Sequence, residues 1–186
     1  RTSASVKTLQ DENIDAMQVD LDKTDQSIDI AGKDVFYLLA PHAAGEQDTR
    51  MQRFLKLASG KPRRLIYLST TGVYGDCQGA WIDETAPVAP RADRARRRVD
   101  AESQVRKAAA DGDWHFVIVR VPGIYGPGRL PLQRLRDKLP LLRADLAPFT
   151  NRIHVDDLAT IFVALRTQGR SGEIYNATDG HPGNMT

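Results

Sequence analysis

Short apolar runs alternate with amphipathic segments along the whole chain. Runs rich in Ile, Val, Leu and aromatic residues have the length of β-strands, and the segments between them repeat apolar residues at the three- and four-residue spacings of helices. The alternation predicts an α/β fold, a doubly wound and mostly parallel sheet with helices on both faces. The expected strands are residues 13–19, 34–40, 63–69, 114–120 and 173–177, and the expected helices are residues 48–58, 96–110 and 154–167.

The segments that follow the expected strands carry the candidate chemistry. They read VDLD, LLAPHAAG, LSTTGVYGD, VRVPGIYGPGR and YNATDG, and are rich in Gly, Pro and hydroxyl residues. Such residues expose backbone N–H groups and allow a ligand to approach the chain closely. Because parallel sheets bind ligands at the carboxyl ends of their strands, these segments are expected to line one cleft.

Composition limits the classes of protein that fit. The chain has 186 residues, 41% hydrophobic and 27% charged, which is the range of a single globular domain. A formal net charge of +2 gives no reason to expect a nucleic-acid or membrane partner. The single cysteine, Cys77, cannot form an internal disulfide, and no apolar run reaches membrane-spanning length, so a cytoplasmic protein without a metal site is expected.

Five motifs follow one another along the chain: Ser69–Gly75, Asp83–Pro87, Val119–Gly128, Ile153–Ala159 and Ile174–Asn176. Taken together and in this order, they resemble the extended short-chain dehydrogenases/reductases of the NAD-dependent epimerase/dehydratase type. The resemblance implies that residues 1–186 form a partial NAD(P)-binding Rossmann-like domain, truncated at both ends, with residues 126–152 and 177–186 on the substrate side. It also implies an oxidoreductase activity on a small or anionic carbonyl or hydroxyl substrate.

The resemblance assigns cofactor contacts to the strand ends. It implies that Asp20 contacts the adenine ring and that Ala40 and Pro41 lie along the dinucleotide. It also implies that Pro122, Gly123 and Ile124 border the nicotinamide. Arg1 resembles the basic residue that holds a ribose 2′-phosphate, so the cofactor is NAD or NADP with NADP favoured. The implied cofactor-binding residues are Arg1, Asp20, Leu21, Ala40, Pro41, Ser69, Pro122, Gly123 and Ile124.

Substrate contacts follow from the same resemblance. Thr70 stands where the family's Ser or Thr hydrogen-bonds the substrate oxygen, and Tyr74 follows it in the same segment. Sugar-nucleotide epimerases carry an arginine four residues before the histidine of the Ile153–Ala159 motif, and here that position is Thr150. A sugar nucleotide is therefore less expected as the substrate. The implied substrate-binding residues are Tyr125, Arg129, Arg152 and His154.

The chain departs from the family at its catalytic pair. Counting back from Glu102 places Arg98 at the lysine position and Arg94 at the tyrosine position. A guanidinium offers only donors and stays protonated, so it cannot act as the general acid or base. Tyr74, Tyr125 and His154 remain as alternatives for proton transfer, of which the histidine has an ordinary pKa near neutrality. A non-catalytic NAD(P)-binding sensor or regulatory scaffold is the alternative function.

Three further expectations concern surfaces and ends. The cluster of Arg91, Arg94, Arg96, Arg97 and Arg98 lacks interleaved aromatics, so a solvated face is favoured over nucleic-acid binding. The resemblance leaves open that at least one of Arg94 and Arg98 points into the cleft, as the family's Tyr and Lys do from the same helix. The family's Gly-rich phosphate-binding turn has no counterpart, and a preceding unit of roughly 30 residues would be needed to supply it. A homodimer would use the helix at 96–110, whose apolar seam would be Val99, Val105 and Ala108 to Ala110.

Overall fold

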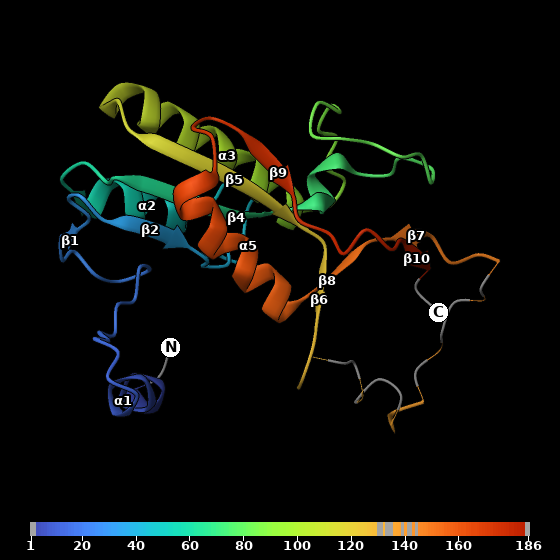
Figure 1. Cartoon of the computed structure of the whole chain (residues 1–186), viewed down its shortest axis with the longest axis horizontal. Helices are drawn as coiled ribbons and strands as arrows, with labels where there is room; N and C mark the ends of the chain where they lie inside the picture. The colour runs from blue at the N-terminus through green and yellow to red at the C-terminus, as the bar shows by residue number, and fades with distance from the viewer. Residues whose placement is uncertain are drawn as a thin grey trace.

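The computed structural model describes residues 3–129, 132, 136–138, 140, 143 and 145–184. Four helices and one short 3-10 helix are described between the strands (Figure 1). The helical elements are α1 (Ser3–Asp11), α2 (Thr49–Leu57), η1 (Thr71–Tyr74), α3 (Asp93–Gly112) and α5 (Val155–Gln168). The strands are β1 (Ile28–Asp29), β2 (Asp34–Tyr37), β3 (Ala58–Ser59), β4 (Arg64–Thr70), β5 (His115–Val121), β6 (Gly123–Tyr125), β7 (Phe149–Thr150), β8 (Arg152–His154), β9 (Ile174–Asn176) and β10 (Gly183–Asn184).

A four-stranded parallel sheet with the order β2-β4-β5-β9 forms the centre of the fold. The longest pairing joins β4 to β5, from Arg64 opposite His115 to Thr70 opposite Val121. Ile66, Val117 and Val119 in these two strands are fully buried, which explains why both segments read as continuous apolar runs. The expected doubly wound architecture with a mostly parallel sheet is confirmed.

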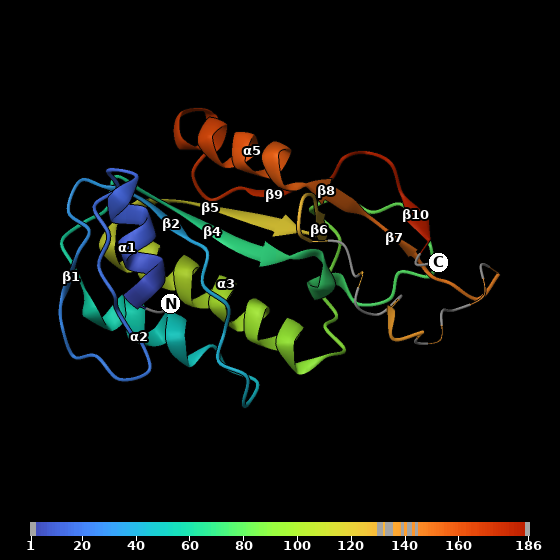
Figure 2. The same ribbon diagram turned by 90° about the horizontal axis from the view of Figure 1, so that it is seen from below.

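Helices cover both faces of this sheet. Figure 2 shows α2 and α3 against one face and α5 against the other. The first layer buries Met51 and Phe54 of α2 together with Val105 of α3, and the second buries Phe162 and Leu165 of α5. Each helix therefore places one apolar stripe on the sheet, as the three- and four-residue spacing predicts.

Short strand pairs extend the fold beyond the central sheet. β1 pairs with β3, and β6 runs parallel to β8 so that Tyr125 lies opposite His154. β7 and β10 form a small antiparallel pair. None of these pairs was expected from the sequence, because two or three residues are too few to show a period.

The N-terminal region differs from its prediction. Residues 13–19, expected as a strand, adopt no regular secondary structure, and Ile14 and Met17 are exposed. The helix α1 precedes them and stands apart from the sheet in Figure 1. The apolar run at 13–19 has no neighbouring strand to pair with among the described residues, so its local pattern alone does not make a strand. Arg1 lies outside the described residues.

The expected dimer seam on α3 is largely internal. Val105 is fully buried in the core cluster that includes Leu65 and Ile118 of the central sheet, and Ala109 is 3% exposed. Val99 and Ala108 are half-buried, and only Ala110 of this set is exposed. The prediction of this seam was wrong for Val105 and Ala109, since a residue in the core of its own domain cannot contact a second subunit.

Within the described part of the chain, no helix combines the length and apolar character needed to cross a membrane.

Candidate cofactor and substrate site

The carboxyl ends of the central strands meet at one edge of the sheet. Thr70 at the end of β4 lies opposite Val121 at the end of β5, so Thr70 and Pro122 are neighbours across the strands. β2 ends at Tyr37 opposite Tyr67, three residues before the end of β4, and the chain then continues in the same direction to Ala40 and Pro41. Parallel pairing thus brings three of the predicted ligand-binding segments to a common edge.

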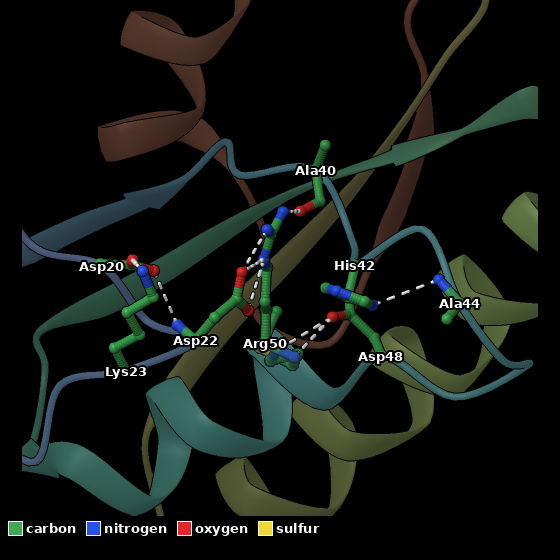
Figure 3. A network of polar contacts seen from close by, with 9 residues as sticks. Asp20, Asp22, Lys23, Ala40, His42, Ala44, Asp48 and Arg50 are labelled. Atoms are coloured by element: carbon green, nitrogen blue, oxygen red, sulfur yellow. Dashed lines mark hydrogen bonds and ion pairs between the residues drawn. The ribbon is translucent and has the colours of Figure 1, made fainter. Parts of the chain in front are cut away.

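A charged network joins the turn at Asp20 to the loop after β2 (Figure 3). Asp20 accepts a hydrogen bond from the Asp22 amide, and the Asp22 carboxylate receives the Arg50 guanidinium at both oxygens. Arg50 Nη1 also donates to the Ala40 carbonyl at 3.1 Å. The guanidinium holds the pKa of Asp22 below its usual range through this hydrogen bonding. Arg50 therefore fixes Asp20 and Ala40 in one arrangement.

A hollow of about 550 Å³ lies beside this network. Leu21, which is 9% exposed, forms part of its lining, and α2 supplies most of the polar side chains. The residues that line it are Leu21, Asp22, His42, Thr49, Gln52, Arg53 and Lys56. The hollow can accept a polar, partly anionic group against an apolar patch.

Two adjacent residues at the end of β4 have different environments. Ser69 is 1% exposed and its hydroxyl donates to Glu102 at 2.6 Å, so it faces the interior under α3. Thr70 is half-buried and its hydroxyl accepts a hydrogen bond from the Gly72 amide at 3.2 Å, which caps η1. The Thr70 hydroxyl proton remains available for another acceptor.

A buried polar network connects α3 to β5 and β9. Glu102 and Arg120 form a two-pronged ion pair with N–O distances of 3.1 and 2.7 Å, and their side chains are only 5% and 4% exposed. The Arg120 guanidinium lies 4.7 Å above the Tyr74 ring, and the Tyr74 hydroxyl donates to Asn176 at 2.9 Å. With 4% exposure and an engaged hydroxyl, Tyr74 links η1 to β9 in this structure.

Three consecutive arginines of α3 hold the loop after β2. Arg96 pairs with Glu46 at 3.5 Å, and Arg97 donates to the Gly45 carbonyl. Arg98 Nη1 donates to the Leu68 carbonyl at 2.8 Å, to the Tyr67 hydroxyl at 3.2 Å and to the Leu39 carbonyl at 3.3 Å. The prediction of a solvated face was wrong for Arg97, which is 8% exposed and turns toward the loop after β2. Arg98 turns toward the sheet edge, which agrees with the alternative that one of Arg94 and Arg98 points into the cleft.

Arg94, the other residue of the substituted catalytic pair, is exposed near the start of α3. Among the described residues, no hydrogen bond or ion pair of its side chain is recorded. Its neighbour Ala95 faces Gly72 of η1, where a Cβ on the glycine would come within 3.9 Å of the alanine methyl group. Arg94 therefore stands at the rim of the sheet edge, close to the Thr70 turn.

A second hollow, of about 340 Å³, lies at the ends of β6 and β8. Tyr125, Gly126, Pro127, Gly128, Leu132 and His154 line it. The Tyr125 and His154 rings meet edge to face with centroids 5.2 Å apart. His154 Nδ1 accepts the Asp156 amide at 3.3 Å and so caps α5, which leaves Nε2 as the nitrogen that carries the proton in the neutral ring.

Two other predicted substrate-binding residues lie outside the lining of this hollow. Arg129 and Arg152 are exposed, and neither is among the residues that line the hollow at His154. Pro122 and Ile124 are half-buried, whereas Gly123 is exposed between them. In the parts of the chain that are described, no set of three His, Cys, Asp or Glu side chains is placed to hold a metal ion.

Several residues at this edge were missed by the sequence reasoning. Asp48 is fully buried, caps α2 through its Oδ1 atom, and has no recorded partner for Oδ2. Burial raises the pKa of Asp48 and, more strongly, the pKa of Tyr37, whose hydroxyl is also buried without a recorded partner. An acidic residue directly before an apolar-periodic segment signals a helix cap, but nothing in the sequence signals its burial.

Comparison with known proteins agrees with this arrangement. Residues 37–178 match the sequence model of the NAD dependent epimerase/dehydratase family. Protein YeeZ of Escherichia coli strain K12 is 30% identical over 120 residues, which cover 64% of this chain and 41% of that protein. The matched stretch is thus less than half the length of this curated relative.

Solved structures share the fold. The UDP-glucuronic acid 4-epimerase of Bacillus cereus in complex with NAD superposes with a TM-score of 0.77 and 20% identity, covering 99% of this chain and 68% of the other. RMD from Pseudomonas aeruginosa complexed with NADPH gives a TM-score of 0.66 and 20% identity over 82% of this chain and 61% of the other. At this identity the likeness establishes the Rossmann-like fold.

Proposed function

The chain belongs to the NAD dependent epimerase/dehydratase family, and we propose that it binds NAD or NADP for oxidoreductase chemistry on a small or anionic carbonyl or hydroxyl substrate. The observation that supports this proposal most is the meeting of three strand ends, those before Ala40, Thr70 and Pro122, at one edge of the sheet. Parallel sheets bind dinucleotides at such an edge. The solved relatives named above are complexes with NAD and NADPH.

The cofactor would extend along this edge from α2 to β6. The adenine end would lie by Asp20 and Leu21, where the larger hollow opens, and the middle would pass Ala40 and Pro41. The nicotinamide end would reach Gly123, whose exposed backbone has no side chain to obstruct a planar ring. When bound, the dinucleotide supplies hydride transfer, while the chain's own residues bind and orient the reactants.

A single added methyl group tests this placement. A Cβ on Gly123 would come no nearer than 3.8 Å to any neighbouring atom, so Gly123→Ala should fold normally. The methyl group would occupy the exposed surface at which the nicotinamide is placed. We expect an unchanged melting temperature and an affinity for NADH and NADPH about tenfold lower by isothermal titration.

Gly183→Ala is the matched control, because a Cβ there would meet nothing within 4 Å. It should bind both cofactors like the unchanged full-length protein. If neither NADH nor NADPH binds the full-length protein at millimolar concentration, the proposal is rejected. A preference for NADPH over NADH in the same titrations would support the assignment of Arg1 to the 2′-phosphate.

His154 is proposed to donate a hydrogen bond from Nε2 to the substrate. Its Nδ1 is committed to the cap of α5, and its ring lines the smaller hollow with Tyr125. His154→Asn should keep the cap, because asparagine is a favourable N-cap residue, and should remove Nε2. The expected result is a normal melting temperature, normal cofactor binding and strongly reduced turnover of any substrate found in a panel of sugar nucleotides and small carbonyl compounds.

Arg94 and Arg98 at the Tyr and Lys positions support a second candidate, a non-catalytic sensor or regulatory scaffold. Tyr74, which could have replaced the missing tyrosine, is buried and hydrogen-bonded to Asn176. A scaffold requires cofactor binding without turnover. Cofactor binding with no oxidation of NADPH by the substrate panel favours the scaffold, and any turnover favours the enzyme.

A homodimer remains a proposal without an assigned surface, because the predicted seam on α3 is mostly internal. Light scattering of the full-length protein would give its mass in solution. The division that places residues 126–152 and 177–186 on the substrate side is likewise proposed. Retention of cofactor binding after substitutions at Tyr125 would support that division.

A further inference from the structure

We propose that Arg94, Arg97 and Arg98 form one binding site for a phosphate group of a ligand, at the rim where α3 meets the carboxyl edge of the sheet. The proposal rests on the function proposed above for its biological meaning, because this rim borders the same cleft. It assigns these arginines to ligand binding through their charge rather than to proton transfer. Phosphate binding can also be measured without cofactor.

The three side chains share one face of α3. Residues three and four positions apart are neighbours on a helix surface, so Arg97 and Arg98 both stand one turn after Arg94. Arg97 turns to the Gly45 carbonyl and Arg98 turns to the Leu68 carbonyl, which fixes this face toward the loop after β2 and the end of β4. Arg94 lies one turn nearer the start of the helix on that face, beyond the strand ends.

The charges of these arginines are not balanced by ion pairs. Among the described residues, none of the three has a carboxylate within 4.0 Å, whereas Arg96 pairs with Asp93 at 2.6 Å and with Glu46. Arg97 is 8% exposed and its Nε atom is buried without a recorded partner. A buried cation with only neutral acceptors is costly, and an anion that reached it would offset that cost.

The N-terminus of α3 adds to the positive charge of these arginines. α3 begins after Ala92, which provides no side-chain cap. The Ala95 and Arg96 amides donate to the Ala92 carbonyl, whereas in the described structure the Asp93 and Arg94 amides have no acceptor. The positive end of the helix dipole lies there as well, and it disfavours arginines unless an anion is present. Of the carboxylates near these arginines, Asp48 interacts electrostatically with Arg98 but is enclosed in the core. Asp93 and Glu46 are both paired with Arg96.

A phosphate group fits this arrangement by chemistry. It offers several acceptor oxygens and up to two negative charges, and guanidinium groups bind such oxygens with pairs of parallel hydrogen bonds. Arg98 uses Nη1 for three neutral acceptors, and no partner is recorded for its Nε and Nη2 atoms in the described structure. In the proposed site, these donors and those of Arg94 bind the same anion.

Isothermal titration of the full-length protein with inorganic phosphate tests the site, with chloride at matched ionic strength as the blank. We expect saturable binding that Arg94→Gln weakens about tenfold, as loss of one charge-assisted contact implies. Arg94 is exposed and without a recorded partner, so the variant should fold normally. Arg91→Gln is the control with the same charge change, since Arg91 pairs with Asp76 at 3.2 Å outside the helix, and it should leave binding unchanged.

A second titration identifies the source of the phosphate. If saturating NADPH abolishes phosphate binding, the site holds a phosphate of the cofactor, and if both bind together it holds one from the substrate. Equal phosphate affinity in the Arg94→Gln and Arg91→Gln variants, or no saturable binding at all, would overturn the site. Failure of NADPH binding alone would reject the proposed function and leave the phosphate site standing.

Discussion

Two groups of buried charges involve α3, which contributes Glu102 to one and Arg97 to the other, and they are organised in opposite ways. Glu102 and Arg120 neutralise each other's charge through two hydrogen bonds, beside Ser69 and the Tyr74 ring, although Arg120 Nη1 is buried without a partner in the described structure. Asp48 and Arg97 are also buried, but among the described residues neither forms an ion pair, and Asp48 Oδ2 and Arg97 Nε have no hydrogen-bond partner.

The difference separates a structural role from a binding role. A closed ion pair holds strands and helix in register, and removing one partner exposes the other charge to a low dielectric. An open set of charges is less stable by itself, and a ligand that supplies the missing partner can bind there. We therefore expect substitutions in the closed pair to change stability most, and substitutions in the open set to change pH dependence or binding.

Glu102→Gln should have the largest effect. It leaves the Arg120 cation buried without a counter-charge, so the free energy of unfolding should decrease by about 3–5 kcal/mol. Urea denaturation monitored by circular dichroism measures this change. The double variant Glu102→Gln/Arg120→Met should recover much of the loss, and a double variant as unstable as the single one would show that the pair is not the cause.

Asp48→Asn should stabilise the protein at neutral pH by about 1 kcal/mol, because it removes a desolvated carboxylate while keeping the cap of α2. Burial raises the pKa of Asp48 in the folded protein above its ordinary value. Its contribution to stability is therefore complete below the ordinary pKa and is lost as the pH rises through the folded pKa.

Unfolding free energies at pH 4, 5 and 7 check this sign. The unchanged protein should lose stability relative to the Asp48→Asn variant as the pH increases, so the benefit of the substitution should grow with pH. A benefit that is the same at each pH would indicate that Asp48 remains charged throughout.

Tyr74→Phe should lower the free energy of unfolding by about 1 kcal/mol, because it deletes one hydrogen bond to Asn176 and leaves the stacking on Arg120 in place. Thermal unfolding followed by calorimetry measures it. If turnover is found and this variant loses it without losing stability, Tyr74 takes part in catalysis, and the closed network is more than structural.

Arg91→Gln should have the smallest effect, below about 1 kcal/mol, because its pair with Asp76 is solvent-exposed. The same denaturation series measures it. A larger loss would mean that exposed pairs contribute to this fold as much as the buried contacts of Tyr74, which would weaken the contrast between the two groups of charges.

Much of the central fold could be predicted from local pattern. The expected strands at 63–69 and 114–120 correspond to β4 and β5, and the helix expected at 154–167 corresponds to α5. The strand predicted at residues 13–19 was wrong, because among the described residues this apolar run pairs with no neighbouring strand. Local periodicity therefore succeeded where the surrounding sheet agreed with it.

The sequence predicted where the candidate site lies, but it did not predict which side chains contact one another there. Strand-end segments placed Thr70 and Pro122 at one edge, and pairing of β4 with β5 confirms that they are neighbours. The closed role of Tyr74 depends on Asn176, which is distant in sequence, and no local pattern reports such a contact. The assignments of cofactor and substrate contacts remain predictions.

The sequence by itself determined the alternation of strands and helices, the family and the arginines at the Tyr and Lys positions, because these depend on residue identity and short-range spacing. The tertiary structure alone decided which arginines face the sheet edge and which charges are paired. Burial and pairing depend on packing between segments far apart in the chain, and the cost of an unpaired charge appears only once water is excluded from it.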